Sequence, residues 1–289
     1  MANLGFQPIS VEELPKWRGE IVNKILGLTQ PKLVTRTIEK VQSEYDQDKW
    51  SRARAIYRSD PHHSARSLLE TLIDADPDRQ RACVVNGQLG TWTCRALYTH
   101  LIDAMERWFG PSIAASNSVV ELGAAFGAYP LLLSERFPDK SFYGADLSPN
   151  AISLAREVSG QRKNVAFEEF NFLSEHYPIL DRAAGPVTVF TAQALEQLPS
   201  AERPIATLLS VKSKIHRVFH LEPVFELHDN DLLGLMRKRY AEISDYNRDL
   251  LGVLRRHESA GRLKVMRVEK NTFAFNPFNC LSLIEWAPL

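Results

Sequence analysis

One glycine-spaced turn and the acidic residue that follows it carry most of the chemistry that this sequence suggests. An apolar stretch ends at Glu121-Leu122, and Gly123, Ala125 and Gly127 follow at intervals of two residues. Asp146 ends the next apolar stretch, about twenty residues later, where an acid can bind ribose hydroxyls. Glycine permits a tight turn and a close approach of backbone to a ligand. The pattern predicts a pocket for an adenosine-bearing cofactor at the carboxyl edge of a sheet.

Alternating strands and helices around this turn are predicted to position these residues. We expect strands at Val119–Leu122, Ser141–Ala145, Val165–Phe167, Val187–Thr191, His216–Leu221, Leu263–Glu269 and Leu281–Trp286. We expect helices at Tyr129–Phe137, Pro149–Ser159 and Asp229 to about His257, the last broken near Ser244. Short connections between such elements give an α/β fold with a Rossmann-like sheet, parallel except for an antiparallel carboxyl-terminal hairpin and covered on both faces.

The pattern before residue 115 is mostly helical. We expect helices from Val11 to about Leu28, from Pro31 to Tyr57, after Pro61, and from a Thr93 cap through Trp108 to Gly110-Pro111. Asn86-Gly87 between two apolar stretches predicts a small hairpin. We therefore divide the chain into residues 1–92, an amino-terminal helical substrate-cap region, and residues 93–289, the cofactor-binding domain.

Composition narrows the classes of partner. The 289 residues hold 35 basic and 35 acidic side chains, so no overall positive field attracts nucleic acid, and we expect no nucleic-acid partner. The cysteines are Cys83, Cys94 and Cys280, without the spacing of a zinc or redox site, which favours a cytoplasmic protein. The sequence has no apolar stretch of about eighteen residues, so we expect no membrane span. The oligomeric state is left open, a homodimer included.

A nicotinamide-dependent oxidoreductase is one interpretation of the glycine turn. Two features oppose it. Glu121 precedes the first glycine, and an acid there repels a nearby pyrophosphate while it can hold the amino and ribose side of another cofactor. The carboxyl-terminal pattern, a helix and then two closely spaced strands, also differs from a second mononucleotide-binding half.

Both features resemble the class I S-adenosylmethionine-dependent methyltransferases, over roughly residues 95–289. The family's E-x-G-x-G-x-G motif is matched by Glu121, Gly123, Ala125 and Gly127, with alanine in place of the middle glycine. The resemblance implies S-adenosyl-L-methionine as cofactor, further bound by the residues listed next. They are Asp146 and Leu147 after the second strand, Asn171 and Phe172 after the third, and Gln193 after the fourth.

The stretch from Thr191 to Pro199 resembles the fourth motif of the small-molecule branch of that family. The DPPY-type signature of nucleic-acid base methyltransferases is missing from it. The resemblance implies methyl transfer to a small-molecule acceptor. A non-catalytic adenosyl-binding protein with the same fold is a further alternative.

Methyl transfer to an alcohol or an ammonium group needs a base near the strand ends. We select Glu196, His220 and Glu222 as catalytic candidates. For His216, His220 and Glu222, which share one face of a strand, substrate contact, a structural role and metal ligation are all considered, and no metal is expected. Glu196, Glu222 and Glu226 can surround a positive substrate, which favours nitrogen (amine, amino acid or guanidino group) over oxygen as the acceptor, with an O-methyltransferase of a natural product as the alternative.

Aromatic residues from the amino-terminal helices are candidates for the pocket wall, because such helices can cover a substrate site. Trp50, Tyr57, Trp92 and Tyr98 are the candidates, each with a place in the core as the alternative.

Overall fold

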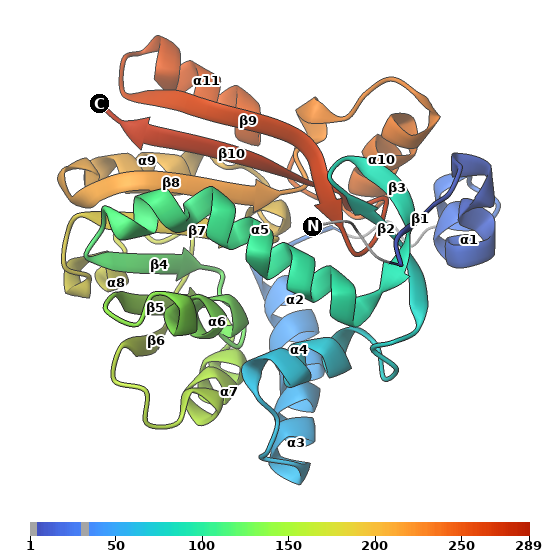
Figure 1. Ribbon diagram of the computed structural model, residues 1–289. Helices are drawn as coiled ribbons and strands as arrows, with labels where there is room; N and C mark the ends of the chain where they lie inside the picture. Colours follow the sequence, from blue (N-terminus) through green and yellow to red (C-terminus); the bar gives the residue numbers. More distant parts are fainter. Residues whose placement is uncertain (1–4, 30–34) are drawn as a thin grey trace.

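The centre of the protein is one mixed sheet. The computed structural model describes residues 5–29 and 35–289. Its strands are Gln7–Pro8 (β1), Gln80–Val85 (β2), Gln88–Thr93 (β3), Ser118–Leu122 (β4), Ser141–Asp146 (β5), Val165–Glu169 (β6), Val187–Ala192 (β7), Ile215–Glu222 (β8), Leu263–Ala274 (β9) and Leu281–Pro288 (β10). Within the described residues they form a ten-stranded sheet in the order β1-β3-β2-β9-β10-β8-β7-β4-β5-β6 (Figure 1).

The strand directions match the predicted fold. Strands β8, β7, β4, β5 and β6 are parallel, and β10 is antiparallel to both β8 and β9. The chain runs outward from β4 to β6 and returns to β7 on the other side of β4. This reversal opens a crevice at the carboxyl ends of β4 and β7, the usual ligand position in open α/β sheets.

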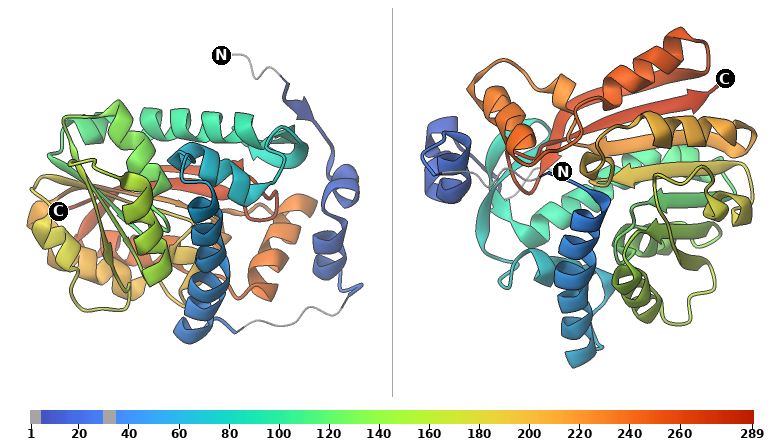
Figure 2. Two further views of the ribbon diagram at one scale, coloured as in Figure 1. Left: turned by 90° about the horizontal axis from the view of Figure 1, so that it is seen from below. Right: turned by 180° about the vertical axis from the view of Figure 1, so that it is seen from behind.

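Helices cover both faces of the sheet (Figure 2). The α-helices are Leu14–Ile25 (α1), Ile38–Gln42 (α2), Ser51–Ser59 (α3), Ala65–Ile73 (α4), Cys94–Ala114 (α5), Ala128–Arg136 (α6), Pro149–Ser159 (α7), Pro178–Arg182 (α8), Glu202–Ser210 (α9), Leu232–Ile243 (α10) and Leu250–Ser259 (α11). A π-helix, Ser43–Trp50 (η2), joins α2 to α3. Short 3-10 helices lie at Val11–Glu13 (η1), Leu195–Gln197 (η3), Lys212–Lys214 (η4) and Phe225–Leu227 (η5).

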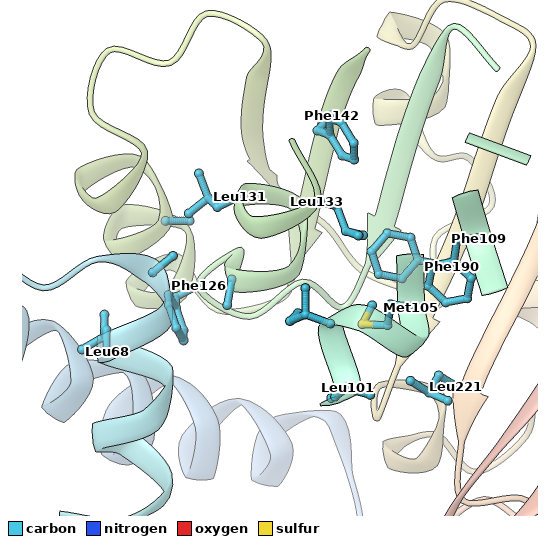
Figure 3. Close-up of a cluster of buried hydrophobic side chains, with 14 of the residues drawn as sticks. Leu68, Leu101, Met105, Phe109, Phe126, Leu131, Leu133, Phe142, Phe190 and Leu221 are labelled. Carbon is cyan, nitrogen blue, oxygen red and sulfur yellow. The ribbon is translucent and has the colours of Figure 1, made fainter. Parts of the chain in front are cut away.

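Two apolar layers hold these helices on the sheet. Helices α5, α6 and α7 pack on one face, where Phe109 of α5 lies beside Phe190 of β7 (Figure 3). The ring centroid of Phe109 is 5.3 Å from that of Phe190 and 4.7 Å from that of Phe219 on β8. Helices α8, α9 and α11 pack on the other face, around Trp286 and Ile284 of β10. Strands β4 and β7 at the centre of the sheet are buried on both faces, and apolar residues predominate in them. In β6, at the edge of the sheet, Val165 and Phe167 are buried, whereas Ala166 between them is exposed.

The predicted elements are confirmed with a few differences. Helix α5 begins at the Thr93 cap, whose side chain accepts a hydrogen bond from the Ala96 N–H, but it continues through Pro111 to Ala114. A proline removes only one helical hydrogen bond near a helix end, and burial of Phe109 and Ile113 holds the last turn in place. The break near Ser244 is present between α10 and α11. Helices α8 and α9 and strand β1 were not predicted.

The amino-terminal region contributes strands as well as helices. The hairpin at Asn86-Gly87 is β2 and β3, and β9 extends past Glu269 to Ala274 to pair with β2. The predicted helix from Pro31 begins outside the described residues, and the described helical segment runs from Ile38 to Ser59. In residues 5–29 and 35–289, no helix is both long and apolar enough to cross a membrane.

Candidate functional site

A cavity of about 260 Å³ lies at the carboxyl ends of β4, β5, β6 and β7, with η2 and α2 on its other side. Its charged lining residues are Arg36, Lys49, Glu121, Asp146 and Glu196. All nine residues predicted to bind the cofactor, except Gly127, line this cavity, as does the catalytic candidate Glu196. The strand reversal therefore brings the two predicted halves of the site together.

The glycine turn follows β4 as expected, but its glycines make room for neighbouring protein. Gly123 has a φ of +79°, and a Cβ there would overlap the Cβ of Ala194 in the loop after β7. Gly127 has a φ of +76°, and a Cβ there would overlap the ring of Phe167 on β6. These two glycines therefore permit close packing of two loops and a strand around the cavity, and Gly123 also lines the cavity.

Asp146 holds the turn in place from the end of β5. Its Oδ2 accepts a hydrogen bond from the Ala125 N–H (2.7 Å), and its Oδ1 accepts one from the Ser148 N–H (2.9 Å). Ala125 has a φ of +51°, which alanine seldom adopts, and this hydrogen bond fixes its amide. Burial raises the pKa of Asp146, whereas these hydrogen bonds and the charge of Lys49 lower it. Each carboxylate oxygen retains capacity to accept another hydrogen bond.

Glu121 is a buried acid whose carboxyl group is not fully hydrogen-bonded within the described residues. Its side chain is 1 % exposed, and its Oε2 has no hydrogen-bond partner among the described residues. Burial raises its pKa well above the ordinary value, and the charges of Asp146 and Glu222 add to the increase. A buried carboxyl group without a donor is costly, so a positive hydrogen-bond donor in the cavity would be stabilised there.

The remaining predicted cofactor residues surround the same space. Leu147, Phe172 and Gln193 line the cavity, and Gln193 has a φ of +54° in the turn after β7. Asn171 also lines it, but its Oδ1 accepts a hydrogen bond from the Leu173 N–H (2.8 Å). The side-chain amide of Asn171 therefore also stabilises its own loop, a contact that the sequence pattern did not indicate.

Glu196 is the buried carboxyl group on the other side of the cavity. Gln197 Nε2 donates a hydrogen bond to its Oε1 (2.8 Å), and Asn279 Nδ2 donates one to its Oε2 (3.0 Å). Burial raises the pKa of Glu196 to about 8, with a further increase from the charge of Glu222. A carboxyl group of this kind can accept a proton near neutral pH, the requirement for a general base.

His220 and Glu222, which were selected as catalytic candidates, are not among the lining residues of the cavity. His220 is fully buried between Thr191, whose Oγ1 is 3.0 Å from Nδ1, and Trp286, whose Nε1 donates to Nε2 (2.9 Å). Glu222 accepts backbone N–H hydrogen bonds from Ala194 (3.0 and 3.1 Å) and Leu195 (3.1 Å). The antiparallel pairing of β10 with β8 buries this strand end. Both side chains are therefore hydrogen-bonded to other groups of the protein.

The expected group of three acids around a positive substrate does not form. Glu226, in η5, is exposed and accepts a hydrogen bond from the Gly252 N–H (2.9 Å). Glu222 is enclosed by backbone amides, so only Glu196 of the three lines the cavity. The count of acids therefore gives no preference for a nitrogen acceptor.

The amino-terminal helices provide the wall opposite the sheet. Trp50 and Tyr98 line the cavity, as predicted, whereas Tyr57 and Trp92 are not among its lining residues. Asp46 attaches η2 to the cofactor side, because its Oδ1 accepts hydrogen bonds from Ser148 Oγ (2.5 Å) and the Asn150 N–H (2.9 Å).

Three residues of the site were missed from the sequence. Arg36 precedes α2 and Lys49 lies in η2, and in such a helical region a charged residue usually indicates only a solvated face. Asn279 lies in the loop between β9 and β10, and no local pattern indicates its contact with Glu196. These segments are far apart in the sequence, so only the folded structure shows that Arg36, Lys49 and Asn279 meet at the site.

Comparisons with known proteins identify the fold. No protein-family model matches the sequence, and no curated protein matches it. A similar solved structure is magnesium protoporphyrin IX methyltransferase (ChlM) from Synechocystis PCC 6803 with bound SAH, at a TM-score of 0.53 and 14% identity. The alignment covers 86% of this chain and 99% of that one.

Two further solved structures align at lower scores. PigF with SAH has a TM-score of 0.44 and 13% identity, covering 96% of this chain and 72% of that chain. The glycopeptide N-methyltransferase MtfA complexed with sinefungin has a TM-score of 0.44 and 12% identity, covering 64% and 85%. The likeness to ChlM shows that this chain has the Rossmann-like fold of the class I methyltransferases.

Proposed function

We propose that the protein transfers a methyl group from S-adenosyl-L-methionine to a small-molecule acceptor. The observation that carries this proposal is that two carboxyl groups, those of Asp146 and Glu121, lie at one wall of the cavity. Asp146 retains acceptor capacity at the end of β5, and Glu121 is buried with an unpartnered oxygen at the end of β4. The fold shared with ChlM, whose structure contains SAH, supports the same cofactor.

The residues of this wall suit the parts of that cofactor. Asp146 would accept hydrogen bonds from the ribose hydroxyls, and Glu121 would accept one from the amino group. Leu147 and Phe172 would flank the adenine, with Asn171 and Gln193 as polar neighbours. The cofactor would supply a methyl group already activated by its positive sulfur.

Glu196 would act on the acceptor. Its carboxylate would take a proton from an amine or hydroxyl group of the acceptor, and the hydrogen bonds from Gln197 and Asn279 would keep it oriented. A base is useful to either kind of acceptor when the acceptor group is protonated. We therefore propose a nitrogen or oxygen acceptor that must lose a proton during transfer.

Residues 1–92 would act as the substrate cap in this proposal, and residues 93–289 as the cofactor-binding domain. Helix η2 and residues near Ile38 form the wall opposite the sheet, so they would exclude water from the reacting groups. We also propose a cytoplasmic enzyme that does not use nucleic acid as its substrate, consistent with the balanced charge.

Ligand binding followed by a product assay tests this function. SAH should raise the melting temperature and bind saturably in calorimetry, while NADH should do neither. The protein with S-adenosylmethionine and a pool of small amines, phenols and acids should then give a product heavier by one methyl group in mass spectrometry. Binding of NADH in place of SAH would indicate the oxidoreductase. Tight SAH binding with no methylated product from a full metabolite extract would favour a non-catalytic adenosyl-binding protein.

A further inference from the structure

Lys49 is a cation of the cavity without a protein counter-ion. Its Nζ lies over the rings of Tyr45 and Trp50, 5.0 and 4.6 Å from the centroids, and it forms no ion pair within residues 5–29 and 35–289. Aromatic faces attract a cation without neutralising it. The accessible surface of Lys49 therefore presents a positive charge, without an ion-pair partner among the described residues, to a cavity that already contains the predicted cofactor-binding residues.

Arg36, the other cation of the cavity, is already engaged by protein groups. Its Nε donates to the Ser244 carbonyl oxygen (2.8 Å), it hydrogen-bonds to Gln197 Oε1, and it lies 3.6 Å from a carboxylate oxygen of Glu44. Its guanidinium also lies over the ring of Tyr246, 4.8 Å from the centroid. Lys49 is consequently the cation that remains available to a ligand.

The π-helix gives Lys49 this position and keeps it there. Its i→i+5 hydrogen bonds widen the turn, and π-helical turns often occur at functional sites. Tyr45, Lys49 and Trp50 all line the cavity. Asp46, between them in sequence, is bonded to Ser148 and Asn150, and Arg54 of α3 pairs with Glu157 of α7 at 2.6 Å. These contacts attach the helical segment to the cofactor side of the protein.

The carboxylates that face Lys49 have other partners. Asp146 is engaged by two backbone amides, and Glu196 is engaged by the side-chain amides of Gln197 and Asn279. Removal from water lowers the pKa of Lys49, while Glu196, Asp146 and Glu44 raise it in part. The ammonium group gains most from an anion that enters the cavity, because no carboxylate in residues 5–29 and 35–289 forms an ion pair with it.

We propose that Lys49 is the anion-binding residue of the cavity and pairs with a carboxylate of a bound ligand. This inference rests on the proposed function. Two ligands can supply a carboxylate there: the amino-acid part of the cofactor, and an acidic acceptor such as a small aromatic acid. Trp50, Tyr98 and Phe275 give the same cavity aromatic surface suited to the latter.

Calorimetry with matched ligands separates these sources. SAH contains the amino-acid carboxylate, whereas 5′-methylthioadenosine has the same adenosine and sulfur without it. The proteins are the parent, Lys49→Met, Lys49→Arg and the control Lys40→Met, which removes an exposed lysine of α2. A second titration adds 4-hydroxybenzoate or its neutral amide, 4-hydroxybenzamide, to SAH-saturated protein.

We expect Lys49→Met to weaken the binding of one carboxylate ligand by about tenfold or more. Lys49→Arg and Lys40→Met should change the affinity for that ligand by about threefold or less. Loss of SAH affinity with 5′-methylthioadenosine unchanged assigns Lys49 to the cofactor carboxylate. Loss of 4-hydroxybenzoate affinity with SAH unchanged assigns it to the acceptor. Parent-like binding of both acids by Lys49→Met overturns the inference but leaves the proposed function intact. Failure of the parent to bind SAH and 5′-methylthioadenosine overturns both.

Discussion

The ends of β5 and β8 present the same feature with different consequences. Each ends in an acid that accepts hydrogen bonds from backbone amides of a neighbouring loop. Asp146 accepts one from Ala125 and a second from Ser148 in its own loop, and Glu222 accepts them from Ala194 and Leu195. Asp146 lines the cavity, and Glu222 does not. An acid at a strand end therefore indicates that a loop is held in place, and only the shape of the cavity decides whether a ligand also reaches it.

The neighbours of each strand explain the difference. Strand β5 lies between β4 and β6, and the turns after these parallel strands leave space above it. Strand β8 pairs with β7 on one side and with antiparallel β10 on the other, where Ser282 is opposite Glu222. The loop after β7 covers Glu222, and backbone amides of this loop donate hydrogen bonds to the Glu222 carboxylate. Glu196, in that same loop, is carried into the cavity instead.

The largest effect is expected from Glu196→Gln. The amide keeps the shape of the side chain but cannot take a proton, so kcat should fall by about 100-fold to 10,000-fold. The parent rate should rise with pH and level off above about pH 8, because burial raises the pKa of Glu196 to about 8 and the ionised form is the base. Steady-state kinetics between pH 6 and 9.5 measure both effects.

Cofactor binding provides the control for this variant. Glu196→Gln should keep its affinity for SAH within about threefold, since the residue is assigned to the acceptor. A parent-like rate and pH profile would show that Glu196 is not the base.

Asp146→Ala should have the next largest effect. The change removes charge-assisted hydrogen bonds to the ribose and releases the Ala125 amide, so SAH binding should weaken by about 1.5 to 3 kcal/mol. Calorimetry measures the change, and circular dichroism checks the fold. The matched control is Asp181→Ala, which removes an exposed acid after β6. A loss in Asp146→Ala no greater than in this control would contradict the ribose assignment.

Glu222→Gln tests the other strand end and should affect stability more than the site. Its amide can accept hydrogen bonds from fewer of the backbone N–H groups now bound to Glu222, and its own N–H₂ group would face donors. We expect unfolding to become easier by about 1.5 to 3 kcal/mol, measured by urea denaturation. SAH affinity should fall by about threefold or less if the loop after β7 keeps its course. Unchanged stability together with lost turnover would instead return Glu222 to the reaction.

The comparison also shows what could be predicted from the sequence. The cofactor half was predictable because its signals are local: a strand, the turn with Gly123 and Gly127, and Asp146 at the next strand end follow one another in the chain. The acceptor half depends on contacts between distant segments. Lys49 and Asn279 reach the cavity from the amino-terminal and carboxyl-terminal regions, and no spacing within either segment indicates this.

The misassignment of His220 has the same origin. Period-two alternation places His220 and Glu222 on one face of a strand, but it does not reveal whether cavity or core covers that face. Trp286 of β10 occupies the position beside His220, and this depends on how the antiparallel hairpin docks. The layer that covers a polar strand residue must therefore be known before a role can be assigned to that residue.

His220→Leu should have the smallest effect on the site, with SAH affinity and kcat within about threefold of the parent. The variant should still lose about 2 to 3 kcal/mol of stability, because it leaves the Trp286 indole N–H and the Thr191 hydroxyl without their partner.

Nε2 of His220 accepts the indole hydrogen bond, so the proton of the neutral ring lies on Nδ1, which donates to Thr191. Burial lowers the pKa of His220 to about 3, and the unfolded chain titrates near 6.5. The folded state thus binds fewer protons, and the parent should lose about 2 kcal/mol between pH 7 and pH 5 through this residue. The variant should lack that loss, so urea denaturation at both pH values should show a smaller difference than in the parent. An equal difference in both proteins, or a collapse of kcat in a well-folded variant, would show that β8 does more than support the loop beside the cavity.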